Sequence, residues 1–426
     1  MNSILYKNEL DPIKLTFRSN TIDYFRTIIM SKYRLIDLSK ANTKETIIKL
    51  SISKMNIFDI VLYLHKHELL QITCSNLINI ITKNKYNDFK NYINNGLSGT
   101  LIDDINELYQ NNQIPEYILG RHINKYIINT FVECNIIDYI LHNIQYKYEY
   151  SIKYKNININ LNIYGKRVTD KEFNDIITRI ILLGLYKSID DLININIDLY
   201  MIPHKKNINN YIKHNDNILG PREINSGFSI SKKILCVYRT EELNKVLVHE
   251  LIHYLELDLD DVKFPNISSH FNINPNTKFI RINEAYTEIL AIMINTIINT
   301  PNISCTKQIL DYELTYSCYQ VAKILNLANF DTSYDFFYNK YDGKNKFKQN
   351  TSIFSYFILK TALLYNLDSF LDGYLNNTIH QYNFIDFILN QFSLEYINTI
   401  NDFMNYIKNM KDKSNLYYTL RMTCYK

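Results

Sequence analysis

Tryptophan is absent from this 426-residue sequence, and glycine (9) and proline (7) are scarce. Tyrosine (36) and phenylalanine (21) are abundant, and asparagine, isoleucine and lysine are visibly frequent. These five residue types have A/T-rich codons, so the bias indicates genome composition rather than a functional low-complexity segment. We therefore expect an A/T-rich source such as a large DNA virus, a parasite or a low-GC bacterium. The asparagine runs and tyrosine stretches therefore do not indicate a function.

Cysteine is also sparse. The six cysteines are scattered, and no two of them form a Cys-x-x-Cys pair. Disulfide-stapled proteins and all-cysteine zinc sites are recognised by regular cysteine spacing. The sequence indicates neither of them.

The sequence also lacks a large excess of one charge sign and long apolar runs. There are 47 Lys and Arg residues against 43 Asp and Glu, a formal net charge of +4 that is too small to indicate a nucleic-acid partner. The first ten residues lack the layout of a signal peptide. No uninterrupted apolar run approaches the roughly 18 residues that cross a bilayer. We expect a soluble, intracellular protein with no membrane partner, in the cytoplasm, or in the host cytoplasm or virion if it is viral. The oligomeric state is left open.

The spacing of apolar residues divides the chain into three regions. Residues 1–145 form an N-terminal helical region, because apolar residues recur three and four positions apart. In residues 146–258, alternation predicts strands at 146–164, 192–202 and 227–238, and helical spacing predicts helices at 170–188 and 241–257. Residues 259–426 are again helical. The predicted fold class is α+β, mostly helical, with a small mixed β-sheet lobe preceding a helical C-terminal lobe.

One stretch carries metal chemistry: His249-Glu250-Leu251-Ile252-His253. On a helix, residues i and i+4 face the same way, so two imidazoles can reach one zinc ion. Glu250 then lies beside the ion, where a carboxylate can take a proton from water. The alternative is a pair of buried core histidines that bind backbone carbonyls.

A catalytic zinc ion needs a third protein ligand and one open position. The metzincin pattern requires Gly at position 256 and His at 259, where this chain has Glu256 and Leu259. The Gly-Thr turn of the aspartate-ligand pattern is also absent. His270 lies in a loop with no motif around it. Further carboxylates follow the helix in a loop run that is more typical of solvated acids: Asp258, Asp260 and Asp261.

A second motif, Asn283-Glu284-Ala285-Tyr286-Thr287-Glu288, resembles that of the gluzincins, the thermolysin- and aminopeptidase-like superfamily of zinc metallopeptidases. By this resemblance Glu284 is the third zinc ligand. Glu288 then holds a zinc-binding histidine by its other ring nitrogen, with Asn283 beside the ligands in the same supporting layer. The resemblance covers residues 227–288. The gap from His253 to Glu284 is longer than in thermolysin, which implies an insertion in the connecting loop.

The same resemblance implies a peptide or protein substrate and a mechanism. The strand at 227–238 becomes the edge against which an extended peptide lies. Glu250 is the general base, and Tyr356 is a candidate donor to the oxyanion, with His380 a weaker one. The Gly-x-Met-Glu-Asn signature of zinc aminopeptidases is absent, which favours an endopeptidase or carboxypeptidase. The alternative is a non-catalytic zinc-binding scaffold with a gluzincin-like fold.

Overall fold

The structure is a computed structural model that describes residues 4–16, 21–34, 70–74, 78–79, 132, 134–144, 146–187, 192–209, 218–261, 264, 266–344 and 346–425. The chain forms two compact units. The first, here called the sheet unit, consists of Phe58–Lys205 and Asn225–Leu257. The second, the helical unit, consists of Met1–Ile57, Lys206–Ile224 and Asp258–Lys426. The architecture is α+β with a helical C-terminal region, as the sequence predicts.

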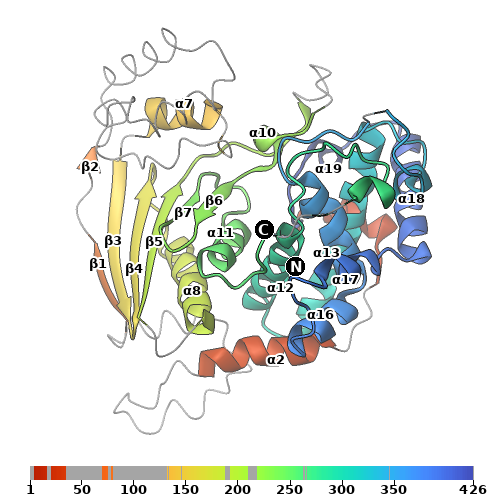
Figure 1. Cartoon of the computed structure of the whole chain (residues 1–426). Coiled ribbons are helices and arrows are strands. Elements are labelled where there is room, and N and C mark those ends of the chain that lie inside the picture. Colours follow the sequence, from red (N-terminus) through yellow and green to blue (C-terminus); the bar gives the residue numbers. More distant parts are fainter. Residues whose placement is uncertain are drawn as a thin grey trace. The chain divides into compact units, whose positions relative to one another are not determined.

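The sheet unit is built on a mixed sheet of seven strands, in the order β1-β3-β4-β5-β7-β6 with β2 also paired to β3 (Figure 1). β3 and β4 are antiparallel, β4, β5 and β7 run parallel, and β6 is antiparallel to β7. Among the described strands, β6 therefore forms one edge. The bounds are β1 Gln71–Cys74, β2 Ile78–Asn79, β3 Tyr146–Tyr154, β4 Ile157–Tyr164, β5 Ile193–Tyr200, β6 Gly227–Ile230 and β7 Ile234–Val237.

The alternation of apolar and polar residues gives β4 and β5 two different faces. Successive side chains of a strand point to opposite sides, so the isoleucines of both strands share one face and the polar residues the other. Polar side chains pair across the two strands: Asn158 donates to Asn194 (3.0 Å), Asn160 to Asn196 (2.9 Å) and Asn162 to Asp198 (2.7 Å).

Helix α8 (Asp170–Lys187) connects the parallel strands β4 and β5. It begins where the sequence predicts: the Glu172 amide donates to Thr169 Oγ1 (3.2 Å), and the Thr169 amide donates to the Glu172 carboxylate (2.8 Å). This reciprocal arrangement satisfies amide groups that a helix start leaves unpaired. At Gly184, an added Cβ would lie 2.8 Å from Ile157 Cδ1, so α8 packs closely on β4.

Two local expectations are wrong. The N-terminal region does contain helices α2 (Thr21–Arg34) and α7 (Cys134–Asn143), but β1 and β2 also lie within it. Both strands are short and obtain their hydrogen bonds from β3, a partner distant in sequence, so local periodicity does not reveal them. Two short helices at 7–10 and 11–13 also belong to this region, whereas residues 35–69 and 80–131 fall outside the described residues.

The stretch 227–238 is a hairpin rather than one strand. β6 ends at Ile230 and β7 begins at Ile234, with the Lys233 amide donating to the Ile230 carbonyl (2.9 Å) across the turn. Lys232 adopts a left-handed φ of 54°. The three residues between the two apolar runs are polar and exposed, which suits a turn at the protein surface.

The helical unit has a core rich in phenylalanine. The Phe271 ring contacts five other phenylalanine rings at centroid distances of 5.1–6.2 Å. Its elements are α1 Lys7–Leu10, η1 Asp11–Ile13, α2, α10 Pro221–Ile224, η4 Ile267–Ser269, α12 Asn283–Asn299, α13 Ile303–Leu327, α14 Ser333–Phe337, the π-helix η5 Phe354–Leu359, α15 Lys360–Tyr365, α16 Leu367–Leu375, α17 Phe384–Leu389, α18 Leu394–Asn409 and α19 Asn415–Tyr418.

Among the residues that the structure describes, no helix is long and apolar enough to cross a bilayer.

Candidate metal centre

Helix α11 (Leu243–Tyr254) carries the two histidines of the first motif. It contains neither Gly nor Pro, and nearly all of its residues are buried, including Leu247, Val248 and Leu251. Apolar burial around most of its circumference holds the helix against β6, β7 and α8. The polar residues of the motif are therefore fixed in a protein interior: His249 is 5% exposed and Glu250 is 6% exposed.

The two imidazoles converge. The Nε2 atoms of His249 and His253 lie 3.2 Å apart, and the ring planes are inclined by 76°. Two nitrogens bound at about 2.05 Å to one tetrahedral ion lie about 3.3 Å apart. The histidine pair therefore has the separation that a shared metal ion requires.

Glu284 supplies the third ligand atom. It is the second residue of α12, and it is buried with an exposure of 7%. One ligand atom from each of His249, His253 and Glu284 lies within 4.8 Å of the others. A set of two imidazole nitrogens and one carboxylate oxygen suits a borderline cation such as zinc. The structure thus confirms that these three residues, singled out from the sequence, form a cluster that could hold a metal ion.

The base candidate Glu250 lies next to the first histidine on α11, and its side chain runs along the start of β6. A Cβ added to Gly227 would be 3.0 Å from both Cγ and Oε1 of Glu250. Gly227 is not among the residues that the sequence motifs single out. Glycine is scarce in this chain, and a glycine inside a strand often marks the close approach of another group. These two facts together could have drawn attention to Gly227.

A thiol also lies in this part of the sheet unit. Cys236 is fully buried on β7, and burial, followed by the nearby Asp198 and Glu250 carboxylates, raises the pKa of its thiol well above the ordinary value. A protonated thiol is a poor nucleophile and a poor metal ligand. Cys236 is therefore a packing residue beside Glu250.

The supporting residues of the second motif are buried. Glu288 is 0% exposed and follows Glu284 by about one turn of α12. Asn283 is the first residue of that helix, and its carbonyl accepts a hydrogen bond from Thr287 Oγ1 (3.2 Å). Burial of Glu288 and Asn283 agrees with the resemblance, which implies that they support the zinc ligands. Their contact with the histidines stays a prediction.

The competing ligand candidates lie outside the cluster. Asp258 accepts a weak hydrogen bond from Thr287 Oγ1 (3.5 Å), and Asp261 lies 4.0 Å from the Arg281 guanidinium. Asp260 and His270 are exposed. Among the described residues, the imidazoles and carboxylates that converge in this way are those of His249, His253 and Glu284, here called the triad.

Tyr356 lies on the π-helix η5 and is half-buried. η5 contacts α12, the helix that carries Glu284. Its role as an oxyanion donor stays a prediction. The weaker candidate His380 is exposed, and its amide donates to Asn383 Oδ1 (2.8 Å).

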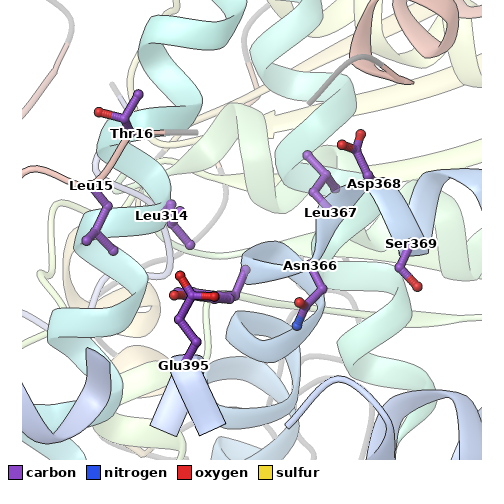
Figure 2. A pocket seen from close by; sticks show the side chains of 9 residues that line it. Leu15, Thr16, Leu314, Asn366, Leu367, Asp368, Ser369 and Glu395 are labelled. Carbon is purple, nitrogen blue, oxygen red and sulfur yellow. The ribbon is translucent and has the colours of Figure 1, made fainter. Parts of the chain in front are cut away.

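A separate pocket of about 600 Å³ lies in the helical unit (Figure 2). Asp368 and Glu395 are the carboxylates on its wall, and no histidine or cysteine is found among its lining residues. None of the triad residues lines it. This pocket therefore lacks the nitrogen and sulfur ligands of a transition-metal site.

The chain is similar to an uncharacterized viral protein. Over 205 residues the chain is 30% identical to an uncharacterized protein of Acanthamoeba polyphaga mimivirus, a match that covers 45% of this chain and 51% of the relative. The chain thus spans about half the length of this relative. No protein-family model matches the chain, and no solved structure matches it. The viral origin of the relative is consistent with the A/T-rich viral source that the composition suggests.

Proposed function

We propose that this chain is a zinc-dependent metallopeptidase that hydrolyses peptide bonds. His249, His253 and Glu284 would hold the zinc ion, and Glu250 would act as general base. The observation that carries the proposal is the convergence of two imidazole nitrogens and one carboxylate oxygen within 4.8 Å. The intact glutamate beside the first histidine adds the group that hydrolysis needs and that a purely structural zinc site does not.

Zinc is proposed because of the number and kind of ligands. Structural zinc sites close the tetrahedron with four protein ligands, whereas catalytic sites use three and leave one position open. The described cluster has three members. Their burial favours tight positioning, because packed neighbours restrict the rotamers of the side chains.

The chemistry follows from this arrangement. When bound, the zinc ion would supply Lewis-acid polarisation of the scissile carbonyl and acidification of a water molecule. The Glu250 carboxylate would take the proton of the attacking water and return it to the leaving amine nitrogen. The edge strand β6 would offer its free backbone groups to an extended peptide.

Tyr356 would donate its phenolic hydrogen to the developing oxyanion. Its place on a π-helix supports this role, because π-helical turns are frequent at functional sites. The lack of an aminopeptidase signature favours internal or C-terminal cleavage over removal of N-terminal residues.

Elemental analysis of the purified full chain tests the site. Wild type should bind one zinc ion per chain and His253→Ala none, whereas His270→Ala, an exposed histidine outside the cluster, should keep the metal. Zinc retained by His253→Ala would exclude the site. Stoichiometric zinc without turnover of a broad peptide library would instead favour a non-catalytic zinc-binding scaffold.

A further inference from the structure

Gly227 is one of nine glycines in the chain and the first residue of β6. Its backbone does not require glycine: it is not among the residues with positive φ, and β6 pairs regularly with β7 from Gly227↔Val237 to Ile230↔Ile234. A glycine in a regular strand forfeits side-chain packing, so it needs another reason. Close approach of neighbouring groups is that reason here.

The space beside Gly227 is occupied on two sides. A Cβ at this position would lie 2.9 Å from the Cys236 carbonyl oxygen and 3.0 Å from both Cγ and Oε1 of Glu250. Contacts this short overlap the van der Waals envelopes of a close-packed interior. An alanine at position 227 would therefore displace the β6 backbone, the Glu250 side chain, or both.

Helix α11, which carries Glu250, has little freedom to move. Glu250 is 6% exposed, and α11 contacts both β6 and β7. The next residue, Leu251, is fully buried, which fixes the rotation of the helix about its axis. A shift forced on the carboxylate is therefore met by rotation of its own side chain rather than by movement of the helix.

We infer that Gly227 is a positioning residue for Glu250. The missing side chain leaves the volume in which the carboxylate lies, and it lets the edge strand approach the base closely. This inference rests on the proposed function for its consequence, because the carboxylate is the proposed general base. Proton transfer depends on placement within about 0.5 Å, so a small displacement should slow the chemistry more than it weakens binding.

A double-mutant cycle on the metal-free full chain tests the contact without any assay of activity. Thermal unfolding is followed for wild type, Gly227→Ala, Glu250→Ala and the double variant. Gly227→Ala should lower the melting temperature by about 2–6 °C. In the Glu250→Ala background the loss should fall to half or less, because the side chain that the new Cβ meets is gone. An equal loss in both backgrounds would show that the new Cβ is hindered by the Cys236 carbonyl and not by Glu250. That result would overturn the inference.

A kinetic test asks whether the contact positions the base. With peptide substrate, Gly227→Ala should lower kcat by about 10- to 100-fold, with KM changed by less than about twofold. Zinc content should equal that of wild type. Gly184→Ala is the matched control, because its Cβ would meet Ile157 Cδ1 at 2.8 Å in the same unit without facing Glu250. An equal fall of kcat in Gly184→Ala would reduce the role of Gly227 to general stability.

The two proposals fail separately. If the wild-type protein turns over no peptide, the proposed function fails while the unfolding cycle still decides the contact. If Gly227→Ala does not fold, the double variant decides: recovery of folded protein on adding Glu250→Ala supports the inference, and a double variant that also fails to fold overturns it.

Discussion

His249 and His253 present their Nε2 atoms to each other at 3.2 Å from adjacent turns of the buried helix α11. When both nitrogens are unprotonated, their lone pairs converge on one region of space, an arrangement that a shared cation stabilises. The four-residue spacing sets the direction of both rings, and the burial of the helix restricts how they can turn away. Metal binding and stability of the fold should therefore be linked.

Zinc should raise the thermal stability of the protein through this pair. A ligand that binds only the folded state at about 1,000 times its dissociation constant adds about 4 kcal/mol of stability. We expect wild type to melt several degrees higher with zinc than with a chelator, by differential scanning fluorimetry. His253→Ala should lose this difference, and His270→Ala should retain it. An unchanged difference in His253→Ala would contradict the assignment.

Glu250→Gln should separate metal binding from turnover. The amide keeps the shape of the side chain but cannot accept the proton, so hydrolysis should fall by about 10²- to 10⁴-fold while zinc content is retained. Glu256→Gln is the matched control: Glu256 is exposed just after α11, and its carboxylate contacts Lys232 (2.6 Å) and Ser231 (2.6 Å). Initial rates on a fluorogenic peptide library measure both. Full activity in Glu250→Gln would rule out the mechanism.

Glu284→Gln and Glu288→Gln should differ in their effect on zinc affinity. Removing a charged ligand should abolish stoichiometric binding, whereas loss of a residue that supports a ligand typically costs about 10- to 100-fold in affinity. Competition against a chromogenic zinc chelator measures both constants. Equal affinities of Glu284→Gln and wild type would show that another group completes the site.

A buried lysine of the helical unit should make stability depend on pH. Lys323 on α13 donates to the backbone carbonyls of Leu416 and Thr419, and burial holds the pKa of its amine well below the ordinary value. Between that lowered pKa and about 10.4, the unfolded chain binds a proton that the folded chain does not. Stability therefore rises with pH across this window, by at most about 1.4 kcal/mol per pH unit.

Urea unfolding at pH 7 and pH 9 in the presence of a chelator measures this effect. The free energy of unfolding should rise less with pH in Lys323→Met than in wild type. Lys340→Met, at an exposed position, should follow wild type. Parallel pH dependences of Lys323→Met and wild type would show that the amine does not titrate in this window.

Local pattern predicted most of the elements near the site. The expected helices at 170–188 and 241–257 correspond to α8 and α11, the expected strands at 146–164 correspond to β3 and β4, and α12 lies in the region 259–426 that was expected to be helical. Helical and strand periodicity are properties of neighbouring residues, so they can be read in sequence order. β1, β2 and the turn within 227–238 were missed, because their hydrogen bonds depend on pairing partners.

The sequence by itself determined the chemistry that is available: a glutamate between two histidines four residues apart, and a second pair of carboxylates one helical turn apart. It determined this because side-chain identity and helical spacing are local. The resemblance of the second motif implied Glu284, and the tertiary structure brings a Glu284 carboxylate oxygen within 4.8 Å of the histidine nitrogens. Only the tertiary structure decided that Gly227 lies against Glu250, a contact between residues 23 positions apart. Both outcomes depend on the packing of distant elements, which no local pattern encodes.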